Sequence, residues 1–352
     1  MKMDGPIRRV VKAAVPEGQD VDAGRSRSAR ILSFPSDEVV SVAGLYKAFV
    51  SPFRRRRLVA LDGLDLKVRA GEVFGLLGPN GAGKSTTAKI LIGLLRPTSG
   101  TALVLGRPAG DIEARRSMGY LAENPSYYPY LTGREFLNYC GGLLGIDGPI
   151  RKRVSDELLD EFGLWKSRDL KLKKLSKGMI QRLGLAQAFM GAPDLLILDE
   201  PMSGLDPLGR RLVREKIFEI KSRGGTVLFS SHILPDVETI CDRVGILIGG
   251  KLQRVVTVDQ QSMDEDPPVE LIVDRLDPRT VEEIRKRGTP TRRRGSTYIL
   301  QFDGAGEAQA VLSSAVARGA RVLAYNRLRE SLESVFIREM EPEARDGERK
   351  AG

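Results

Sequence analysis

Cysteine and histidine are scarce in this chain, which has two cysteines, Cys140 and Cys241, and one histidine among 352 residues. So few cysteines exclude a disulfide framework and a cysteine metal cluster, and this usage is typical of a reducing compartment. Long apolar runs are missing as well. A run such as Leu195–Leu198 is far shorter than the ~20 residues that cross a bilayer, and the N-terminus lacks the apolar core of a secretion signal. We therefore expect a chain that neither spans a membrane nor carries its own secretion signal.

Acidic residues are the minority among the charged ones, since 46 Asp and Glu stand against 56 Lys and Arg, for a net charge of +10. The positive excess favours an anionic partner, which could be a phosphate ligand, lipid headgroups or nucleic acid. Net charge alone does not choose among these. The length predicts about two domains, on a prior of ~150 residues each.

The composition changes along the chain and divides it into segments. Residues 1–36 are basic and have no apolar period, so we expect a disordered leader. Residues 37–262 alternate strand and helix patterns, with a mostly helical insertion at about 126–190. After an acidic, proline-containing linker, residues 263–340 predict a small α+β domain, and residues 341–352 are a charged tail.

The first half contains an antiparallel pair and a strand–loop–helix unit. The runs Val39–Val42 and Leu58–Val68 predict antiparallel strands on either side of a basic loop. Glu72–Leu77 predicts a strand that leads into a glycine-rich loop, and the helical spacing that follows predicts a helix over Thr86–Leu95.

Later runs predict the remaining strands. Leu195–Leu198 and Thr226–Phe229 are short and apolar, as expected for parallel strands covered on both faces. The pair Gly249, Gly250 predicts a closing hairpin. For the C-terminal part we expect the strands Val269–Val273, Tyr298–Phe302 and Arg321–Ala324 and the helices Val281–Arg287 and Glu307–Ala317.

The glycine-rich loop matches the phosphate-loop pattern in full. Its residues are Gly78, Pro79, Asn80, Gly81, Ala82, Gly83, Lys84 and Ser85, and we add Thr86, the next residue, to the nucleotide-binding candidates. Glycines let successive N–H groups converge on phosphate oxygens in front of a helix N-terminus. Lys84 would pair with the β and γ phosphates, and the Ser85 hydroxyl would bind Mg²⁺. The alternative is a glycine-rich turn without a ligand.

Two adjacent carboxylates, Asp199 and Glu200, follow the apolar run Leu195–Leu198. Open parallel sheets bind ligands at the carboxyl ends of their strands. Asp199 would orient the magnesium shell, and Glu200 would hold and polarise the attacking water, since phosphoryl transfer depends mainly on alignment and charge neutralisation. Glu200 is therefore the predicted catalytic residue, and a solvated acidic turn is the alternative.

His232 follows the strand-like segment Thr226–Ser231. A lone histidine is more often structural, but a strand end beside the phosphate loop would let this imidazole bond both the γ phosphate and the water-holding carboxylate. We predict a catalytic role for it, by analogy with other groups that sense the γ phosphate.

With these motifs in this order, the chain resembles the nucleotide-binding subunit of an ATP-binding-cassette (ABC) transporter. The segment from Leu175 to Met179, followed by Gln181 and Arg182, occupies the place of the family signature. The resemblance implies that Ser176 and Gly178 contact the γ phosphate of an ATP held by a second subunit, so that two ATP molecules are enclosed in a dimer. The segment has Lys177 and Met179 where the family usually has glycine and glutamine, a variant similar to that of one-subunit cassettes of drug and polysaccharide exporters.

Three more candidates come from the resemblance. Tyr46 has the place of an aromatic residue that stacks on adenine, and ordinary strand packing is its alternative role. Glu123 replaces the usual glutamine of the segment that joins the sheet to the helical insertion, and a carboxylate there would ligate Mg²⁺ and meet the water. Asp206, at the end of the segment that begins at Ser203, would report the state of one site to the other across the dimer interface.

The resemblance covers residues 39–250 and implies an α/β fold, that of a P-loop NTPase ABC cassette with an antiparallel β subdomain and a helical insertion. To this we add the small C-terminal α+β domain. The ending from Ser331 to Phe336 looks like that of exporter cassettes with such a domain, which would be either a stabilising appendage or a regulatory one. The arginine runs Arg54–Arg57 and Arg292–Arg294 would meet anionic lipid headgroups or form a merely solvated face.

The implied function is an ATPase that binds ATP and Mg²⁺ at the cytoplasmic face of the cell membrane. It would pair with a second ATPase subunit, most simply in a homodimer, and drive export through a separate membrane permease that docks on the helical insertion. We expect peripheral contact with the membrane and no specific nucleic acid. The alternatives are a soluble mechanical ATPase of the same fold that acts on ribosomes or DNA, and a phosphate-loop kinase.

Overall fold

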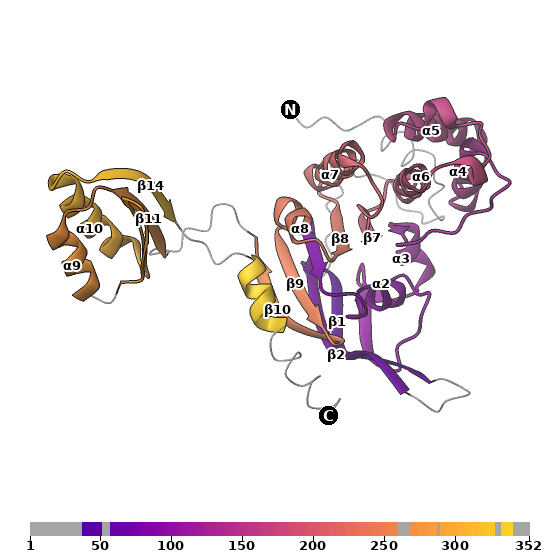
Figure 1. Cartoon of the computed structure of the whole chain (residues 1–352). Helices are drawn as coiled ribbons and strands as arrows, with labels where there is room; N and C mark the ends of the chain where they lie inside the picture. The colour runs from indigo at the N-terminus through magenta and orange to yellow at the C-terminus, as the bar shows by residue number, and fades with distance from the viewer. Residues whose placement is uncertain (1–36, 51–56, 259–267, 287–288, 328–331, 341–352) are drawn as a thin grey trace, which may run out of the picture. The chain divides into compact units, whose positions relative to one another are not determined.

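The structure is a computed structural model that describes residues 37–50, 57–258, 268–286, 289–327 and 332–340 (Figure 1). The predicted leader and charged tail, the tip of the basic loop, most of the linker, Arg287 and Ser331 lie outside the described residues. The chain forms two compact units, Met1–Val258 and Asp259–Gly352, where the sequence predicts a boundary after residue 262.

The first unit is built on a six-stranded sheet with the strand order β10-β9-β3-β8-β7-β6. All neighbouring strands are parallel except β10, which is antiparallel to β9. The bounds are β3 Val73–Leu77, β6 Met118–Leu121, β7 Leu195–Asp199, β8 Thr226–Ser231, β9 Arg243–Ile248 and β10 Lys251–Thr257. Every residue of β3, β7 and β8 is buried, which explains why these strands are short and mostly apolar. The predicted parallel strands and the closing Gly249–Gly250 hairpin are confirmed.

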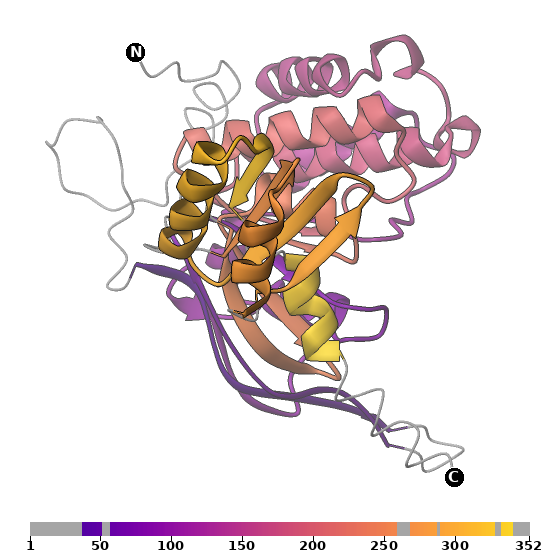
Figure 2. The same cartoon turned by 60° about the vertical axis from the view of Figure 1, so that its left-hand side comes forward.

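A second sheet has the order β2-β1-β4-β5 and is antiparallel. Its strands are β1 Glu38–Val50, β2 Arg57–Arg69, β4 Ser99–Val104 and β5 Arg107–Pro108. β1 and β2 form a long hairpin (Figure 2), so the predicted antiparallel pair is confirmed.

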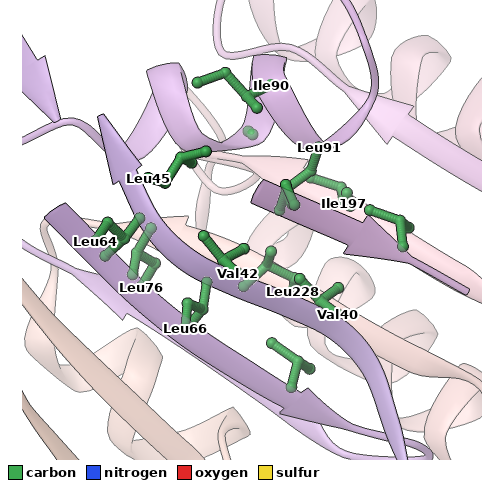
Figure 3. Packing of buried hydrophobic residues seen from close by; sticks show 14 of the residues in the cluster. Val40, Val42, Leu45, Leu64, Leu66, Leu76, Ile90, Leu91, Ile197 and Leu228 are labelled. Atoms are coloured by element: carbon green, nitrogen blue, oxygen red, sulfur yellow. The ribbon is translucent and has the colours of Figure 1, made fainter. Parts of the chain in front are cut away.

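The main core lies between these two sheets and helix α2 (Lys84–Leu91). Figure 3 shows side chains from both layers pointing toward one another. They include Val40, Val42, Leu45, Leu64 and Leu66 from the second sheet, Leu76, Ile197 and Leu228 from the first, and Ile90 and Leu91 from α2. This packing fixes the loop before α2 against both sheets.

Helix α2 is shorter than the predicted Thr86–Leu95, since it begins at Lys84 and ends at Leu91. The chain turns at Gly93, whose φ of +77° is left-handed. A Cβ added at Gly93 would lie 2.3 Å from the Cα of Gly110. The helical spacing therefore continues past the point where a close backbone contact ends the helix.

The helical insertion consists of α4 (Gly133–Leu143), α5 (Gly148–Glu161) and α6 (Lys177–Phe189), which pack on one another. Two short 3₁₀ turns, Trp165–Ser167 and Leu172–Lys174, join α5 to α6. Helix α4 starts with a capping box, in which Thr132 accepts from the N–H of Glu135 and Glu135 accepts from that of Thr132. The remaining helices are α3 Ile112–Arg116, α7 Pro207–Ser222 and α8 Leu234–Ile240. Within the described ranges we find no helix with the length and apolar content that a membrane span needs.

The second unit has the element order β11, α9, β12, β13, α10, β14 and an antiparallel sheet of order β12-β13-β11-β14, which is the split βαβ arrangement. The bounds are β11 Val269–Asp274, α9 Pro278–Lys286, β12 Thr291–Arg294, β13 Thr297–Phe302, α10 Ala305–Ala317 and β14 Arg321–Arg327, and residues 332–340 are helical. The α+β character agrees with the prediction. The arginine run is the edge strand β12, which the sequence analysis did not predict because its arginines suggested a solvated segment.

Candidate functional site

The phosphate loop joins the carboxyl end of β3 to α2, as predicted. It turns on Gly81 and Gly83, whose φ angles are +85° and +109°. Inside the loop, the N–H of Ala82 donates to the carbonyl of Pro79 at 3.2 Å. A Cβ at Gly78 would lie 2.2 Å from the Leu247 carbonyl oxygen, so only glycine fits between the loop and β9. The exposed Asn80 and the half-buried Ser85 and Thr86 complete the rim.

The Lys84 side chain is buried and folds back over its own loop. Its Nζ donates to the carbonyl oxygens of Gly78 at 2.7 Å and Pro79 at 3.1 Å. The same Nζ lies 3.5 Å from Oε1 of Glu200. The ammonium therefore lies between the phosphate loop and the predicted catalytic carboxylate.

Asp199 is the last residue of β7 and is 1% exposed. The hydroxyl of Ser230, its neighbour on β8, donates to Oδ1 of Asp199 at 2.6 Å. The same Ser230 oxygen accepts from the N–H of Glu200 at 3.0 Å. One hydroxyl on β8 thus fixes both acidic residues at the end of β7.

Glu200 has a φ of +51°, which is left-handed and rare for a residue other than glycine. Its Oε2 lies 2.9 Å from Nδ1 of His232, while its buried Oε1 has no hydrogen-bond donor among the described residues. The Gln181 side-chain amide holds the backbone by donating to the carbonyls of Glu200 and Pro201 at 3.4 and 3.3 Å. Strained backbone of this kind persists where the surroundings fix it, and it is common at functional sites.

His232 follows β8 and is 46% exposed. Because an ionised carboxylate only accepts hydrogen bonds, Nδ1 carries the proton in the contact with Glu200, and Nε2 is left for another partner. The turn is shaped by Ser231, whose hydroxyl oxygen accepts from the N–H of Ile233 at 2.9 Å. Since β3, β8 and β7 are neighbours in a parallel sheet, the phosphate loop, His232 and Glu200 meet at the carboxyl ends of these strands.

Ser176 and Gly178 lie at the N-terminus of α6. Ser176 is exposed, and its hydroxyl caps the helix by accepting from the N–H of Met179 at 3.3 Å. A Cβ at Gly178 would be 3.4 Å from the carbonyl oxygen of Gly204, so the signature adjoins the segment that leads to Asp206. Asp206 is exposed and caps α7, because its Oδ1 accepts from the N–H of Gly209 at 2.8 Å.

Tyr46 and Glu123 belong to other strands and segments than the residues described so far. Tyr46 is half-buried on β1, opposite Asp62 of β2 and Ser99 of β4. Glu123 is exposed after β6 and forms no ion pair with a described residue. The structure therefore joins Lys84, Asp199, Glu200 and His232 through hydrogen bonds and ion pairs, in part through Ser230. Among the described residues, no hydrogen bond or ion pair joins Tyr46, Glu123, Ser176 or Asp206 to this group.

Comparisons with known proteins agree with this geometry. Residues 61–203 match a family model described as ABC transporter. An uncharacterized ABC transporter ATP-binding protein of Nostoc is 48% identical over 217 residues, which cover 61% of this chain and 65% of that protein. A protein of the same description in Synechocystis is 40% identical over 287 residues, which cover 81% of this chain and 79% of the relative. This chain belongs to the ABC transporter ATP-binding proteins.

Structural comparison supports the fold of this ABC ATPase. A dimeric ATP-binding cassette in a post-hydrolysis state, bound to ADP and Pi, matches with a TM-score of 0.58 at 23% identity, over 62% of this chain and 99% of that one. The predicted α/β cassette fold is confirmed. As a member of this family, the chain binds ATP and is an ATPase.

The ATPase offers oxygen donors that suit a magnesium ion whose other ligands are phosphate oxygens. Among the described residues no group of three or more His, Cys, Asp and Glu side chains could hold a metal ion. The Ser85 hydroxyl and the Asp199 carboxylate are oxygen donors, and Mg²⁺ is usually bound by one or two such protein ligands together with phosphate oxygens. This set fits Mg²⁺ that enters with the nucleotide.

Ser230 and Gln181 have positions in the site that the sequence analysis did not predict. Ser230 belongs to the strand before His232, and Gln181 to the signature segment, so both lie in stretches that the sequence motifs already mark. The only sign of a role for Ser230 is its position opposite Asp199, and this position can be recognised only when the register between β7 and β8 is known.

Tyr120 of β6 also lies near the site, although no sequence motif gives it a role. Burial and then the nearby Asp199 charge raise the pKa of Tyr120 to about 12.

Proposed function

We propose that this ATPase is the energy-supplying subunit of an ABC exporter and that it works as a dimer around two Mg·ATP. The observation that carries the catalytic part is the connected set Lys84, Glu200 and His232, with 3.5 Å between the first two groups and 2.9 Å between the last two. These groups lie at the sheet edge where the phosphate loop opens.

In this proposal Lys84 leaves its carbonyl partners to bind the β and γ phosphates, and backbone N–H groups of residues 78–86 hold the remaining phosphate oxygens. Ser85 and Asp199 would hold Mg²⁺, and Glu123 would be an additional ligand. Mg²⁺ neutralises charge on the phosphates when it is bound. Tyr46 stacks on the adenine.

Glu200 positions the attacking water. Its Oε1 is buried and lies 3.5 Å from the Lys84 ammonium, but it accepts no hydrogen bond from a described residue and so can accept one from water, while Oε2 is held by His232. Nε2 of His232 is left to donate or accept at the γ phosphate. Catalysis of this kind depends on alignment more than on basicity.

A second subunit supplies the signature residues. Ser176 is exposed and Gly178 is half-buried at the N-terminus of α6, where helix N–H groups and the helix dipole attract an anion. This exposure supports contact with the ATP of a partner subunit. Asp206 adjoins the same surface through Gly204 and would respond to that contact.

Export through a separate permease is supported by relatives. A bacitracin transport ATP-binding protein of Bacillus licheniformis is 41% identical over 203 residues, and a probable multidrug ABC transporter ATP-binding protein of Escherichia coli is 39% identical over 239 residues. We place the ATPase peripherally on the cytoplasmic face of the membrane, with the helical insertion as the docking surface for the permease. Exposed aromatic rings support this, since Tyr128 packs near Tyr130 and Tyr139 with centroid distances of 5.8 and 6.2 Å.

The deciding experiment uses Glu200→Gln. This variant keeps the shape of the side chain but loses the carboxylate, so it should bind ATP, lose nearly all turnover and accumulate as a dimer with Mg·ATP in gel filtration. Unaltered hydrolysis together with a monomer would contradict the proposal. Purification from native membranes should recover an associated permease, whereas recovery only with ribosomes or nucleic acid would favour a mechanical ATPase.

A further inference from the structure

One side of the Tyr46 ring is covered by an arginine of the neighbouring strand. The guanidinium carbon of Arg57 lies 5.4 Å from the centroid of the ring. Tyr46 is half-buried, whereas Arg57 is exposed and forms no ion pair with any described carboxylate. The guanidinium therefore lies over the ring, and among the described residues no carboxylate competes for it.

The hairpin geometry explains how two distant residues meet. Arg57 forms the last rung of the β1–β2 ladder with Val50, while Tyr46 pairs with Asp62. Two irregularities in the ladder lie at Leu45/Tyr46 and between Lys47 and Ala48. Such bulges bend a strand and increase its twist. The two-stranded end of the hairpin therefore curls, and the long Arg57 side chain reaches back over Tyr46.

The same stretch of β2 lies on the phosphate loop. A Cβ at Gly83 would be 2.6 Å from the Ala60 carbonyl oxygen and 2.7 Å from a Leu61 side-chain carbon. Gly83 is also the N-cap of α2. Arg57 therefore lies on the strand that contacts the end of the phosphate loop, three residues before Ala60.

We propose that Arg57 is a nucleotide-binding residue, whose guanidinium and the Tyr46 ring hold the adenine base between them. A guanidinium stacks on aromatic faces, and an ammonium lacks this planar surface. Two stacking layers at the ~3.4 Å spacing of bases need roughly 7 Å between the groups. Because the guanidinium carbon of Arg57 lies 5.4 Å from the centroid of the Tyr46 ring, the exposed guanidinium needs to move away only a short distance to admit the base. Arg57 binds and orients the base and takes no part in the chemical step.

The test compares two ligands that share phosphates and differ in the base. Calorimetric titration of the full chain with ATP and with inorganic tripolyphosphate separates stacking from charge attraction. Arg57→Ala should weaken ATP binding about three- to tenfold, the range of an exposed to partly desolvated cation–π contact, and leave tripolyphosphate binding unchanged. Arg57→Lys should resemble Arg57→Ala. Arg107→Ala, on β5 at the opposite edge of the same sheet, should change neither.

A second background tests the pairing itself. In the Tyr46→Ala background, adding Arg57→Ala should weaken ATP binding only slightly further, because the two groups act together on the base. Equal losses for ATP and tripolyphosphate, an Arg57→Lys variant that binds ATP like wild type, or no loss in Arg57→Ala would each overturn the inference. The inference rests on the proposed ATP site, whose failure would show differently, as wild-type binding of both ligands by Lys84→Ala.

Discussion

Nδ1 of His232 lies 2.9 Å from Oε2 of Glu200, and the other oxygen of that carboxylate is buried without a hydrogen-bond donor among the described residues. The imidazole therefore fixes the rotation of the carboxyl group and aims one oxygen at the space beside Lys84. The backbone of Glu200 is held in a left-handed conformation by Ser230 and Gln181. The position of the Glu200 carboxylate is thus set by contacts within the protein.

Replacing the imidazole should separate binding from turnover. His232→Ala frees the Glu200 carboxyl group to rotate and removes the group that we propose to contact the γ phosphate, so we expect kcat to fall by about 10²- to 10⁴-fold, the range for a positioned proton-bonding side chain. The Kd for ATP, measured by titration, should stay within a few fold. A variant that loses ATP binding along with turnover would indicate a structural role for His232 instead.

The phosphate loop should tolerate no side chain at Gly78. In Gly78→Ala the added methyl would meet the Leu247 carbonyl oxygen at 2.2 Å, so the loop or β9 must shift. Overpacking of this kind costs about 1–3 kcal/mol of unfolding free energy, and ATP binding should fall with it. Thermal unfolding and nucleotide titration measure the two effects.

Gly148→Ala is the matched control for Gly78→Ala. No atom lies within 4 Å of an added Cβ at Gly148, and its φ is not left-handed. The variant should therefore unfold like the wild type. Equal effects of the two substitutions would show that the contact with Leu247 does not govern the loop.

Much of the fold could be predicted from local pattern. The apolar runs that became β7 and β8 are short and uninterrupted because both faces are covered, and the glycine pair closes the hairpin from β9 to β10. The end of α2 could not be predicted, since it depends on the approach of Gly93 to Gly110, a contact between distant parts of the chain. Strand β12 was missed because an edge strand keeps its arginines in water.

The candidate site divides in the same way. Asp199, Glu200 and His232 could be predicted because they follow strand-like runs, and Lys84 because the phosphate-loop motif places it, and the structure brings the four together. Ser230 was missed because its role follows from its pairing with Asp199 across two strands. The contact of Arg57 with Tyr46 likewise depends on ladder irregularities that no local pattern encodes.

Replacing Ser230 should disturb the acidic pair Asp199 and Glu200 more than replacing its neighbour Ser231 does. Ser230→Ala removes the donor to Asp199 and the acceptor for the Glu200 N–H. Hydrogen bonds to charged groups contribute about 1.5–3 kcal/mol, so we expect lower stability and a higher Mg²⁺ concentration for half-maximal ATPase activity. Ser231→Ala, whose hydroxyl bonds only Ile233, should leave the Mg²⁺ dependence unchanged. Equal Mg²⁺ dependence in the two variants would remove Asp199 from the proposed metal site.

The two thiols should be nearly inert in the folded ATPase. Burial raises the pKa of Cys140 to about 11 and raises the pKa of the more deeply buried Cys241 well above its ordinary value. Only the thiolate reacts with alkylating reagents, and a group with that pKa is ionised on the order of one part in a thousand at pH 8. Labelling by iodoacetamide, followed by mass spectrometry, should therefore be slow at pH 8, and for Cys140 it should speed up about tenfold per pH unit below its pKa. In denaturant both thiols should react at the rate of a free cysteine. In the folded Cys140→Ser variant, Cys241 should remain as one slowly labelled site. Fast labelling of the native chain at pH 8 would show that the α4 face around Cys140 opens to solvent.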